Sequence, residues 1–406
     1  MKQSNTQWVK KRHTVIRNLL YPFLYPYCCL RYGIRIAKFK EQGKRPYLIL
    51  LNHQTPFDQF FVSMSFQGAV YYMATEDIFS MGWVSSLIRW LVAPIPIKKQ
   101  TTDLTAVKNC LRVSREGGTI AIAPEGNRTY NGKTVYMNPA IAGLARKLGL
   151  PIALYRIEGG YGVQPRWSDV IRRGKMRGYV SEVIEPAEYA DMTNDQLMTR
   201  IEEGLYVNEA TVDGTYHHRK RAEYLERAIY VCPFCGPAKW ESHGATATCL
   251  NCGRQITYEP TKEITGVGYA FPFRFVADWY SHQEDVVNAL NPADYVDTPL
   301  FWDTAELWDV QTNRNKTCLR RVAQVELYGD RITIDGDGVL GDPLILPFAE
   351  VTACAVLGRN KLNVYHGGNV YQFRGNKRFN ALKYVHFYHR YKNVSKGEPY
   401  GQFLGL

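Results

Sequence analysis

The sequence contains no internal repeat and no long low-complexity linker, and acidic residues are almost missing from its start. Glu41 is the single acid within residues 1–50, which hold eleven lysines and arginines. The apolar stretch of residues 19–30 is twelve residues long and contains two prolines, whereas a helix that crosses a bilayer needs roughly 20 apolar residues. A repeat architecture and a membrane span formed by residues 19–30 are therefore excluded.

The basic residues of this region flank the apolar, tyrosine-rich stretch of residues 19–30. Tyrosine suits the headgroup layer of a bilayer, and lysine or arginine beside it can contact lipid phosphates. With a net charge of +12 for the chain, this pattern favours an anionic lipid surface as partner, and no nucleic acid is expected. We expect residues 1–40 to form an interfacial membrane-binding segment on the cytoplasmic face, peripheral or monotopic. The alternative is a helix packed on the core of the following domain.

A histidine and a carboxylate follow the short apolar run of residues 48–51. Such a run is typical of a parallel strand that is buried on both faces. Thr55 can cap a helix that begins after it and carries Asp58 in its first turn, which leaves His53 in the strand-to-helix turn. Ligands bind outside the carboxyl ends of the strands in open α/β sheets, so His53 is a candidate base with Asp58 as its orienting carboxylate.

The same arrangement recurs further along the chain. Residues 119–123 form another expected buried strand, which runs into Glu125, Gly126 and Arg128. If the two strands are parallel, these residues share one edge of the sheet with His53, and Arg128 adds a fork-shaped anion binder. Each residue alone has an ordinary explanation in turn or surface chemistry. Two short motifs, each directly after a buried strand, favour a functional site instead.

These two motifs resemble those of the glycerolipid acyltransferase family, which includes 1-acyl-glycerol-3-phosphate acyltransferases. The resemblance rests on the His-x4-Asp of His53 and Asp58 and on the Pro-Glu-Gly-x-Arg of residues 124–128, and it extends over roughly residues 15–210. Two weaker blocks agree with it, at residues 95–99 and 150–154. Two positions depart from the family pattern, because Lys99 stands where arginine is usual and Asn127 where threonine is usual.

The resemblance implies transfer of a fatty acyl chain from a thioester, acyl-CoA or acyl carrier protein, to a lysophospholipid hydroxyl. The expected acceptor is 1-acyl-glycerol-3-phosphate, which would give phosphatidate for phospholipid biosynthesis without a catalytic metal. The alternatives are another lysolipid or glycerol-3-phosphate as acceptor, or a nonenzymatic lipid-binding scaffold. The implied roles are general base for His53, ring orientation for Asp58, acceptor phosphate binding for Arg128 and Lys99, positioning of Arg128 or the glycerol for Glu125, and charge stabilisation for amide groups near Gly126.

Predicted strands and helices alternate over residues 41–212, the expected acyltransferase domain. Strands are expected at residues 70–74 and 151–157, and helices at residues 102–115, 139–148 and 193–203. This alternation predicts an α/β fold with a mostly parallel sheet covered by helices. The glycine-rich turn at residues 159–162 lacks a nucleotide fingerprint, and we interpret it as flexible backbone near the site.

Four cysteines form a second motif. Cys232 and Cys235 make one Cys-x2-Cys knuckle, and Cys249 and Cys252 make another. Paired knuckles resemble a zinc ribbon, whose four thiolates close a tetrahedral shell and leave no position for substrate. We therefore predict a structural zinc, with iron or a redox pair as alternatives. The odd total of nine cysteines fits a reducing compartment better than a disulfide framework.

The remainder of the chain is divided into a helix and zinc ribbon at residues 213–260 and a β-rich domain at residues 261–406. The helix is expected near residues 215–230, where its charged run is typical of a solvated face. Short strands with turns between them fill residues 322–373, and a terminal helix is expected over residues 376–393. This order loosely resembles a pleckstrin-homology-like domain. Residues 270–315, aromatic and acidic in patches, are expected to form a connecting lobe, to which we assign no role.

Overall fold

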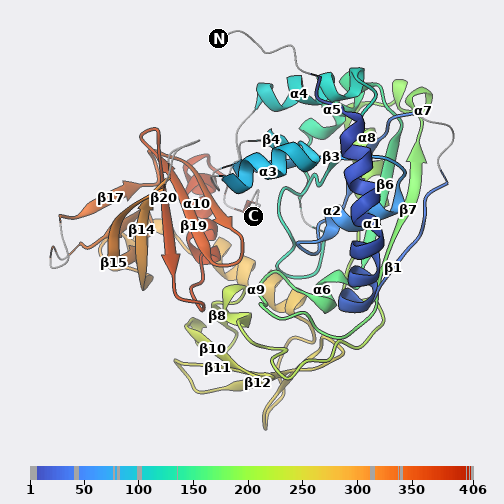
Figure 1. The fold of residues 1–406 in the computed structure, drawn as a ribbon. Coiled ribbons are helices and arrows are strands. Elements are labelled where there is room, and N and C mark those ends of the chain that lie inside the picture. The colour runs from blue at the N-terminus through green and yellow to red at the C-terminus, as the bar shows by residue number, and fades with distance from the viewer. Residues whose placement is uncertain are drawn as a thin grey trace. The chain divides into compact units, whose positions relative to one another are not determined.

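The computed structural model describes residues 7–40, 45–75, 78–79, 83–97, 103–134, 136–310, 316–336, 338, 342–398, 400–401 and 403. The chain divides into two compact units (Figure 1). Unit 1 comprises Met1–Pro165 and Ile171–Tyr216, and unit 2 comprises Arg166–Val170 and His217–Leu406. Each unit has its own sheets and its own core, so each is described by itself.

Unit 1 is built on a seven-stranded sheet with the order β1-β7-β6-β2-β5-β3-β4. The β6–β7 pair is antiparallel, and the other neighbouring strands are parallel. The predicted mostly parallel sheet is thus confirmed. Its strands are β1 (Ile34–Ile36), β2 (Leu48–Leu51), β3 (Val70–Thr75), β4 (Ile95–Ile97), β5 (Thr119–Ile122), β6 (Ile152–Glu158) and β7 (Met176–Ile184).

Helices cover both faces of this sheet, as the unbroken apolar run of β2 predicts. Leu48 and Leu50 belong to a core shared with α4, α5 and α8, whereas Ile49 and Leu51 belong to a core shared with α1 and α2. The side chains of one strand therefore alternate between two cores. The helices of the unit are α1 (Lys11–Tyr32), α2 (Asp58–Ser65), α3 (Trp83–Val92), α4 (Leu104–Arg115), α5 (Ala140–Leu148), α6 (Gly160–Val163), α7 (Pro186–Ala190) and α8 (Asn194–Leu205).

The N-terminal stretch forms one continuous helix, α1, with Pro22 and Pro26 in its interior. Each interior proline removes a helical hydrogen bond, but packing against α2 and α3 offsets that loss. Cys28 and Tyr32 are buried, while several large apolar residues of α1 are exposed. The helix is therefore partly a core helix and partly an apolar surface. No helix among the described residues is long and apolar enough to cross a membrane.

Unit 2 begins with short strands around the four cysteines. A two-stranded sheet pairs β8 with β9, and a four-stranded antiparallel sheet has the order β10-β11-β12-β13. These strands are only two to four residues long, which limits the apolar surface that they can bury. They are β8 (Val231–Cys232), β9 (Gly236–Pro237), β10 (Trp240–His243), β11 (Thr246–Cys249), β12 (Gln255–Tyr258) and β13 (Ile264–Gly266).

The predicted helix at residues 215–230 is wrong. This segment consists of turns and one 3₁₀ turn, η2 (Leu225–Arg227). Its backbone forms short turns within the segment and also bonds to the ribbon: the amide of Ala222 donates to the carbonyl of Gly244, and the amide of Tyr224 donates to Ser242 Oγ (2.6 Å). Tyr224 also has a φ of 71°, which a right-handed helix does not allow. Tertiary hydrogen bonds therefore override the local helix preference.

A seven-stranded antiparallel sheet and the terminal helix α10 (Leu382–Ser395) complete unit 2, which confirms the predicted β-rich region ending in a helix. The unassigned residues 270–315 supply helix α9 (Val276–Ala289), the 3₁₀ turn η3 (Pro292–Tyr295) and β14 (Phe301–Asp309). Because β14 pairs with both β15 and β20, it joins two hairpin groups into one sheet. The remaining strands are β15 (Thr317–Leu327), β16 (Arg331–Ile334), β17 (Leu344–Pro347), β18 (Val351–Leu357), β19 (Lys361–His366) and β20 (Asn369–Gly375).

His386 of α10 is fully buried in the core of unit 2. Its Nδ1 lies 2.7 Å from Tyr230 Oη and its Nε2 lies 3.0 Å from Tyr280 Oη, and its ring stacks on Phe403. Burial lowers the pKa of His386 to about 3 and that of His389 to about 4. Both imidazoles are therefore neutral in the folded protein at neutral pH.

Unit 2 should lose stability in mild acid. An unfolded histidine has a pKa of about 6.5, so below that pH the unfolded chain binds protons that the folded core does not. The contribution of His386 to the free energy of unfolding should be complete above about pH 6.5 and should fall as the pH drops toward 3. Urea unfolding at several pH values should show a shallower pH dependence for His386→Phe. The control His217→Gln changes an exposed histidine and should leave the pH dependence of the free energy of unfolding unaltered. An unaltered pH dependence in His386→Phe would contradict the assignment of the acid sensitivity to His386.

Candidate functional site

The carboxyl end of β2 is fixed by the side chain of Asn52. Its Nδ2 donates to the carbonyl of Ile157 (2.8 Å), and its Oδ1 accepts from the amide of Ile157 (2.7 Å). These two hydrogen bonds extend the pairing of β2 with the parallel β6 by one residue beyond Leu51, the last residue of β2. The chain therefore leaves the sheet at a defined point, immediately before His53.

His53 and Asp58 form the central contact of the site. His53 Nδ1 lies 2.8 Å from Asp58 Oδ2, and the His53 side chain is 27% exposed whereas Asp58 is buried. An ionised carboxylate can only accept hydrogen bonds. Nδ1 of His53 therefore carries the hydrogen and donates a hydrogen bond to Asp58. Nε2 then presents its lone pair for a proton acceptor role, which is the tautomer that a general base requires.

Asp58 also accepts from the turn that precedes it. The amide of Gln54 donates to Oδ2 (2.7 Å), the amide of Thr55 lies 3.0 Å from both oxygens, and Thr55 Oγ1 donates to Oδ1 (2.7 Å). The helix α2 begins at Asp58 and Phe57 precedes it without a side-chain cap, so the predicted capping role of Thr55 is wrong. Thr55 Oγ1 instead accepts from the amide of Phe57 (3.1 Å) and ties the turn to the carboxylate.

The second motif holds the backbone of His53. β5 is the parallel neighbour of β2, and the buried Glu125 that follows it accepts from the amide of His53 (Oε1, 2.8 Å). The amide of Thr129 donates to the carbonyl of His53 (3.2 Å). The turn from Glu125 to Thr129 thus binds His53 on both sides of its peptide unit. The predicted convergence of the two motifs at one sheet edge is what the structure shows.

The other predicted residues differ in what the structure shows of them. Arg128 is partly buried and directly precedes Thr129, the residue whose amide donates to the carbonyl of His53. Gly126 has a φ of 68°, and its own amide already donates to the carbonyl of Ala123 (3.0 Å), so this amide is not available for a developing negative charge. Lys99 lies outside the described residues.

The glycine turn is packed and not flexible, so that interpretation is wrong. Gly160 begins the short helix α6 and is buried, and a Cβ at this position would lie 2.6 Å from the Cβ of Gln54. The side chain of Gln54 in turn accepts from the amide of Tyr161 (Oε1, 2.9 Å). Gly160 is required because the backbone approaches the His53 turn closely. Sequence reasoning missed Asn52 and Gln54, although both directly flank His53.

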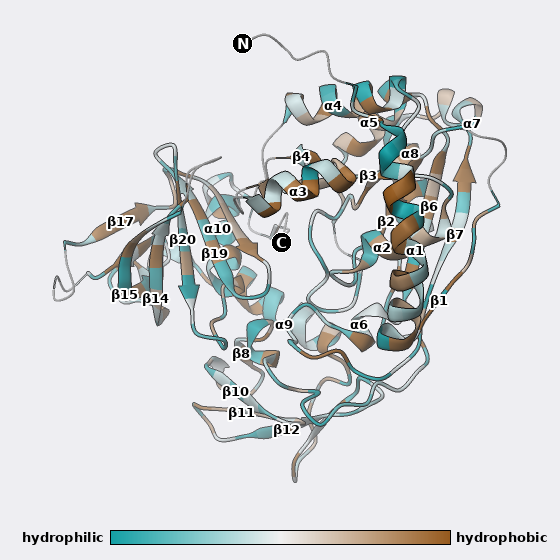
Figure 2. Ribbon diagram, in the orientation of Figure 1, coloured by the Kyte–Doolittle hydropathy of each residue, from teal (hydrophilic) through white to brown (hydrophobic). Residues whose placement is uncertain are grey.

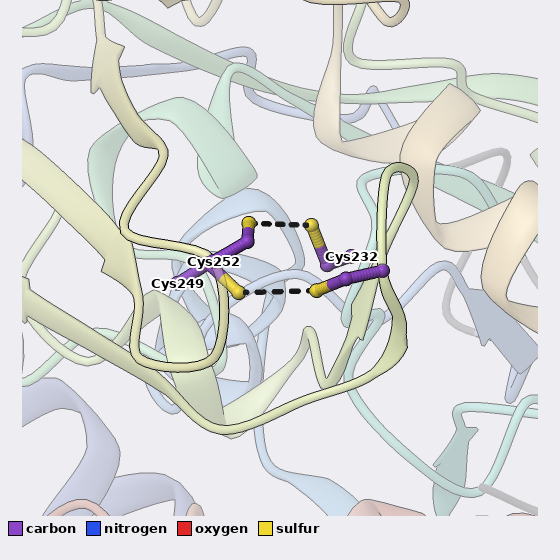
Figure 3. A group of neighbouring side chains, drawn as sticks. Cys232, Cys249 and Cys252 are labelled. Carbon is purple, nitrogen blue, oxygen red and sulfur yellow. Dashed lines mark hydrogen bonds between the residues drawn. The ribbon is translucent and has the colours of Figure 1, made fainter.

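The four cysteines of the knuckles lie together in unit 2 (Figure 3). Their sulfur atoms all lie within 4.8 Å of one another, with Cys232 Sγ 3.8 Å from Cys252 Sγ and Cys235 Sγ 3.6 Å from Cys249 Sγ. Four sulfurs on a tetrahedron with metal bonds of about 2.3 Å are separated by about 3.8 Å. The geometry therefore fits a tetrahedral thiolate metal site, and these separations are far longer than the roughly 2 Å of a disulfide bond.

Comparison with known proteins agrees with the first two motifs. Residues 34–157 match the protein-family model described as Acyltransferase. The 1-acyl-sn-glycerol-3-phosphate acyltransferase of Bacillus subtilis (strain 168) is 21% identical over 136 residues, which cover 34% of this chain and 65% of that protein. The chloroplastic 1-acyl-sn-glycerol-3-phosphate acyltransferase BAT2 of Brassica napus is 22% identical over 164 residues, 39% of this chain and 46% of that protein.

The chain thus spans less than two thirds of the length of these relatives. A solved structure of the 1-acyl-sn-glycerophosphate acyltransferase PlsC from Thermotoga maritima aligns with 48% of this chain and 91% of its own, at 18% identity and a TM-score of 0.36. The matched residues 34–157 include both motifs of unit 1. The predicted resemblance of this part of the chain to glycerolipid acyltransferases is therefore confirmed.

The cysteine cluster should hold a metal that stabilises unit 2. Elemental analysis of purified protein should find about one tightly bound metal ion per chain. Cys235→Ser should lower this content and the thermal stability of unit 2, because binding free energy is folding free energy at such a site. Cys318→Ser, a matched change at a cysteine of the same unit outside the cluster, should preserve both. Retention of the metal in Cys235→Ser would exclude a four-thiolate site.

Proposed function

We propose that this protein transfers a fatty acyl chain from an acyl thioester to the hydroxyl of a lysophospholipid, with 1-acyl-glycerol-3-phosphate as acceptor and phosphatidate as product. The observation that carries the proposal is the contact between His53 and Asp58 at the carboxyl end of β2, within residues that match the acyltransferase family. The names of the B. subtilis and B. napus relatives support the acceptor. The donor is acyl-CoA or acyl carrier protein.

The site residues suggest a simple sequence of bond changes. His53 Nε2 takes the proton of the acceptor hydroxyl, and the oxygen attacks the thioester carbonyl carbon. The buried Asp58 carboxylate stabilises the imidazolium that forms and keeps the ring oriented. The tetrahedral intermediate then collapses, the carbon–sulfur bond breaks, and the proton on His53 passes to the leaving thiolate. The products are the ester and a free thiol, with His53 returned to its starting state.

Arg128 is our candidate for the acceptor phosphate, with Lys99 as a second cation. Guanidinium binds phosphate through two parallel hydrogen bonds, and Arg128 lies in the turn that contacts the His53 backbone. Glu125 supports this turn through the His53 amide, so we assign it a positioning role and no direct contact with substrate. Gly126 allows the turn through its positive φ.

The remaining proposals concern metal, membrane and location. We assign zinc to the four cysteines as a structural metal, because neither motif of the transfer site lies among residues 232–252 and four thiolates leave no position for substrate. The basic, apolar N-terminal segment supports binding to an anionic lipid surface, as a peripheral or monotopic protein on the cytoplasmic face. A lipid-binding scaffold without activity would have no need of the His53 and Asp58 contact.

Product analysis tests the reaction directly. Purified protein offered a panel of lysophospholipids and glycerol-3-phosphate, each with acyl-CoA and with acyl carrier protein thioester, should form phosphatidate from 1-acyl-glycerol-3-phosphate. Mass spectrometry identifies the product and its chain lengths. Preference for another acceptor would redirect the assignment within acyl transfer, and no ester product with any pair would leave the scaffold alternative.

Loss of the base should abolish transfer while the fold remains. His53→Ala should lower turnover by roughly 10²-fold to 10⁴-fold, the usual contribution of a general base. Asp58→Asn should be similarly severe, because an amide can present its donor instead of an acceptor to Nδ1 and so favour the wrong tautomer. Circular dichroism should show folded protein for His53→Ala. Near-normal turnover in His53→Ala would rule out this mechanism.

Arg128 should act on the acceptor more than on the donor. Arg128→Ala should raise the KM for 1-acyl-glycerol-3-phosphate about tenfold or more, and Arg128→Lys should restore little because the fork geometry is lost. Arg115, an exposed arginine of α4, is the matched control, and Arg115→Ala should behave as the unchanged protein. If Arg128→Ala affects acceptors with and without phosphate equally, Arg128 does not bind the phosphate.

A further inference from the structure

Helix α3 is apolar on most of its surface, yet little of it is buried. Its sequence is WVSSLIRWLV, and of its ten residues only Ser85 is buried. Trp83 and Trp90 are 77% and 51% exposed, and Leu87 between them is also exposed. These three residues are spaced i, i+4 and i+7, so they lie on one face of the helix. An apolar helix in a water-soluble domain normally buries such a face.

Helix α1 carries a second stripe of the same kind. Leu19, Phe23, Tyr27 and Leu30 are spaced i, i+4, i+8 and i+11, and all four are exposed, Phe23 by 75% and Leu30 by 86%. Figure 2 shows the hydrophobic residues along α3 and within α1. The two stripes together are much larger than the scattered apolar residues of an ordinary protein surface.

The two helices belong to the same unit and contact each other. The guanidinium of Arg12 lies 5.2 Å from the ring centroid of Trp90, and Trp8 Nε1, just before α1, donates to the carbonyl of Ala93, just after α3 (2.9 Å). Both contacts join the N-terminal end of α1 to the C-terminal end of α3, so the two helices are held together at that end. An arginine beside an interfacial tryptophan can also reach lipid phosphate.

We infer that α3 inserts its tryptophan face into the acyl boundary of an anionic bilayer and acts together with α1 as one docking surface. This rests on the proposed function, since an enzyme of lysophospholipids must meet its acceptor at a bilayer. The occupant is indicated by the residue types: tryptophan and leucine on the outer face, with Arg89 of α3 and the cations of α1 beside them, match an apolar layer bordered by anionic headgroups.

The docking surface reaches the transfer site through Phe57. This residue lies in the turn between His53 and α2, and its ring packs against Tyr27 (6.0 Å between centroids) and Tyr32 (5.0 Å) of α1. Tyr27 belongs to the exposed stripe of α1. With this surface docked on a bilayer, the headgroup of a lysophospholipid in that bilayer lies close to the His53 turn. Its acyl chain can then remain in the apolar layer.

The test uses the full chain and vesicles of phosphatidylcholine with and without phosphatidylglycerol. The double variant Trp83→Ser, Trp90→Ser should bind vesicles that contain phosphatidylglycerol about tenfold more weakly or worse, and brominated lipids should quench less of its tryptophan fluorescence than in the unchanged protein. Trp302→Ser removes a tryptophan of unit 2 that is 60% exposed. This matched control should keep the vesicle binding and the quenching by brominated lipids of the unchanged protein. Circular dichroism should be unchanged, because the replaced side chains are exposed.

Activity separates this inference from the proposed function. The double variant should keep turnover with a short-chain acceptor that is dissolved in water and lose it with acceptor held in vesicles. If the unchanged protein binds vesicles through α3 but esterifies no acceptor, the proposed function fails and the docking surface stands. Equal vesicle binding and equal quenching in the double variant would overturn the inference. So would a dimer in sedimentation that the double variant loses while its vesicle binding is unchanged, since a second copy would then cover α3.

Discussion

The Asp58 carboxylate is the group on which the site of unit 1 depends. It accepts from the amides of Gln54 and Thr55, from the Thr55 hydroxyl and from His53 Nδ1. The Glu125 carboxylate likewise accepts a hydrogen bond from the amide of His53. Two buried carboxylates thus satisfy three consecutive backbone donors, which would be costly to leave unpaired in a buried turn. The orientation of His53 follows from this arrangement, since its backbone and Nδ1 are both held.

Parallel pairing brings these groups together. β2 lies between β5 and β6, so the residues after all three strands emerge at one edge: His53 after β2, Glu125 after β5 and Gly160 after β6. Asn52 bonds across to Ile157 of β6, and Gly160 admits the close approach of Gln54. A site made from three separate segments is rigid because each segment continues a strand of the same buried sheet.

Unit 2 is organised by different contacts. The strands around the four cysteines are short, and a metal held by the sulfur cluster would add its binding free energy to the stability that their packing supplies. Two backbone amides of the segment before β8, those of Ala222 and Tyr224, donate to the ribbon. The larger sheet depends on β14, which pairs on one side with β15 and on the other with β20.

The sequence by itself determined the elements whose signal is local. The apolar run before His53, the spacing of His53 to Asp58, the cysteine knuckles and the Thr193 start of α8, with its reciprocal cap to Gln196, depend on near neighbours in the chain. Tertiary structure alone decided the rest. Thr55 serves the Asp58 carboxylate and not a helix end, residues 215–230 follow the ribbon, α1 continues through its prolines, and β14 closes a sheet from a segment without a clear pattern. For Thr55 the deciding hydrogen bond is to the Asp58 carboxylate, which accepts from the turn before it. In the other cases the deciding hydrogen bonds or contacts come from residues distant in sequence. Local propensity encodes none of these interactions.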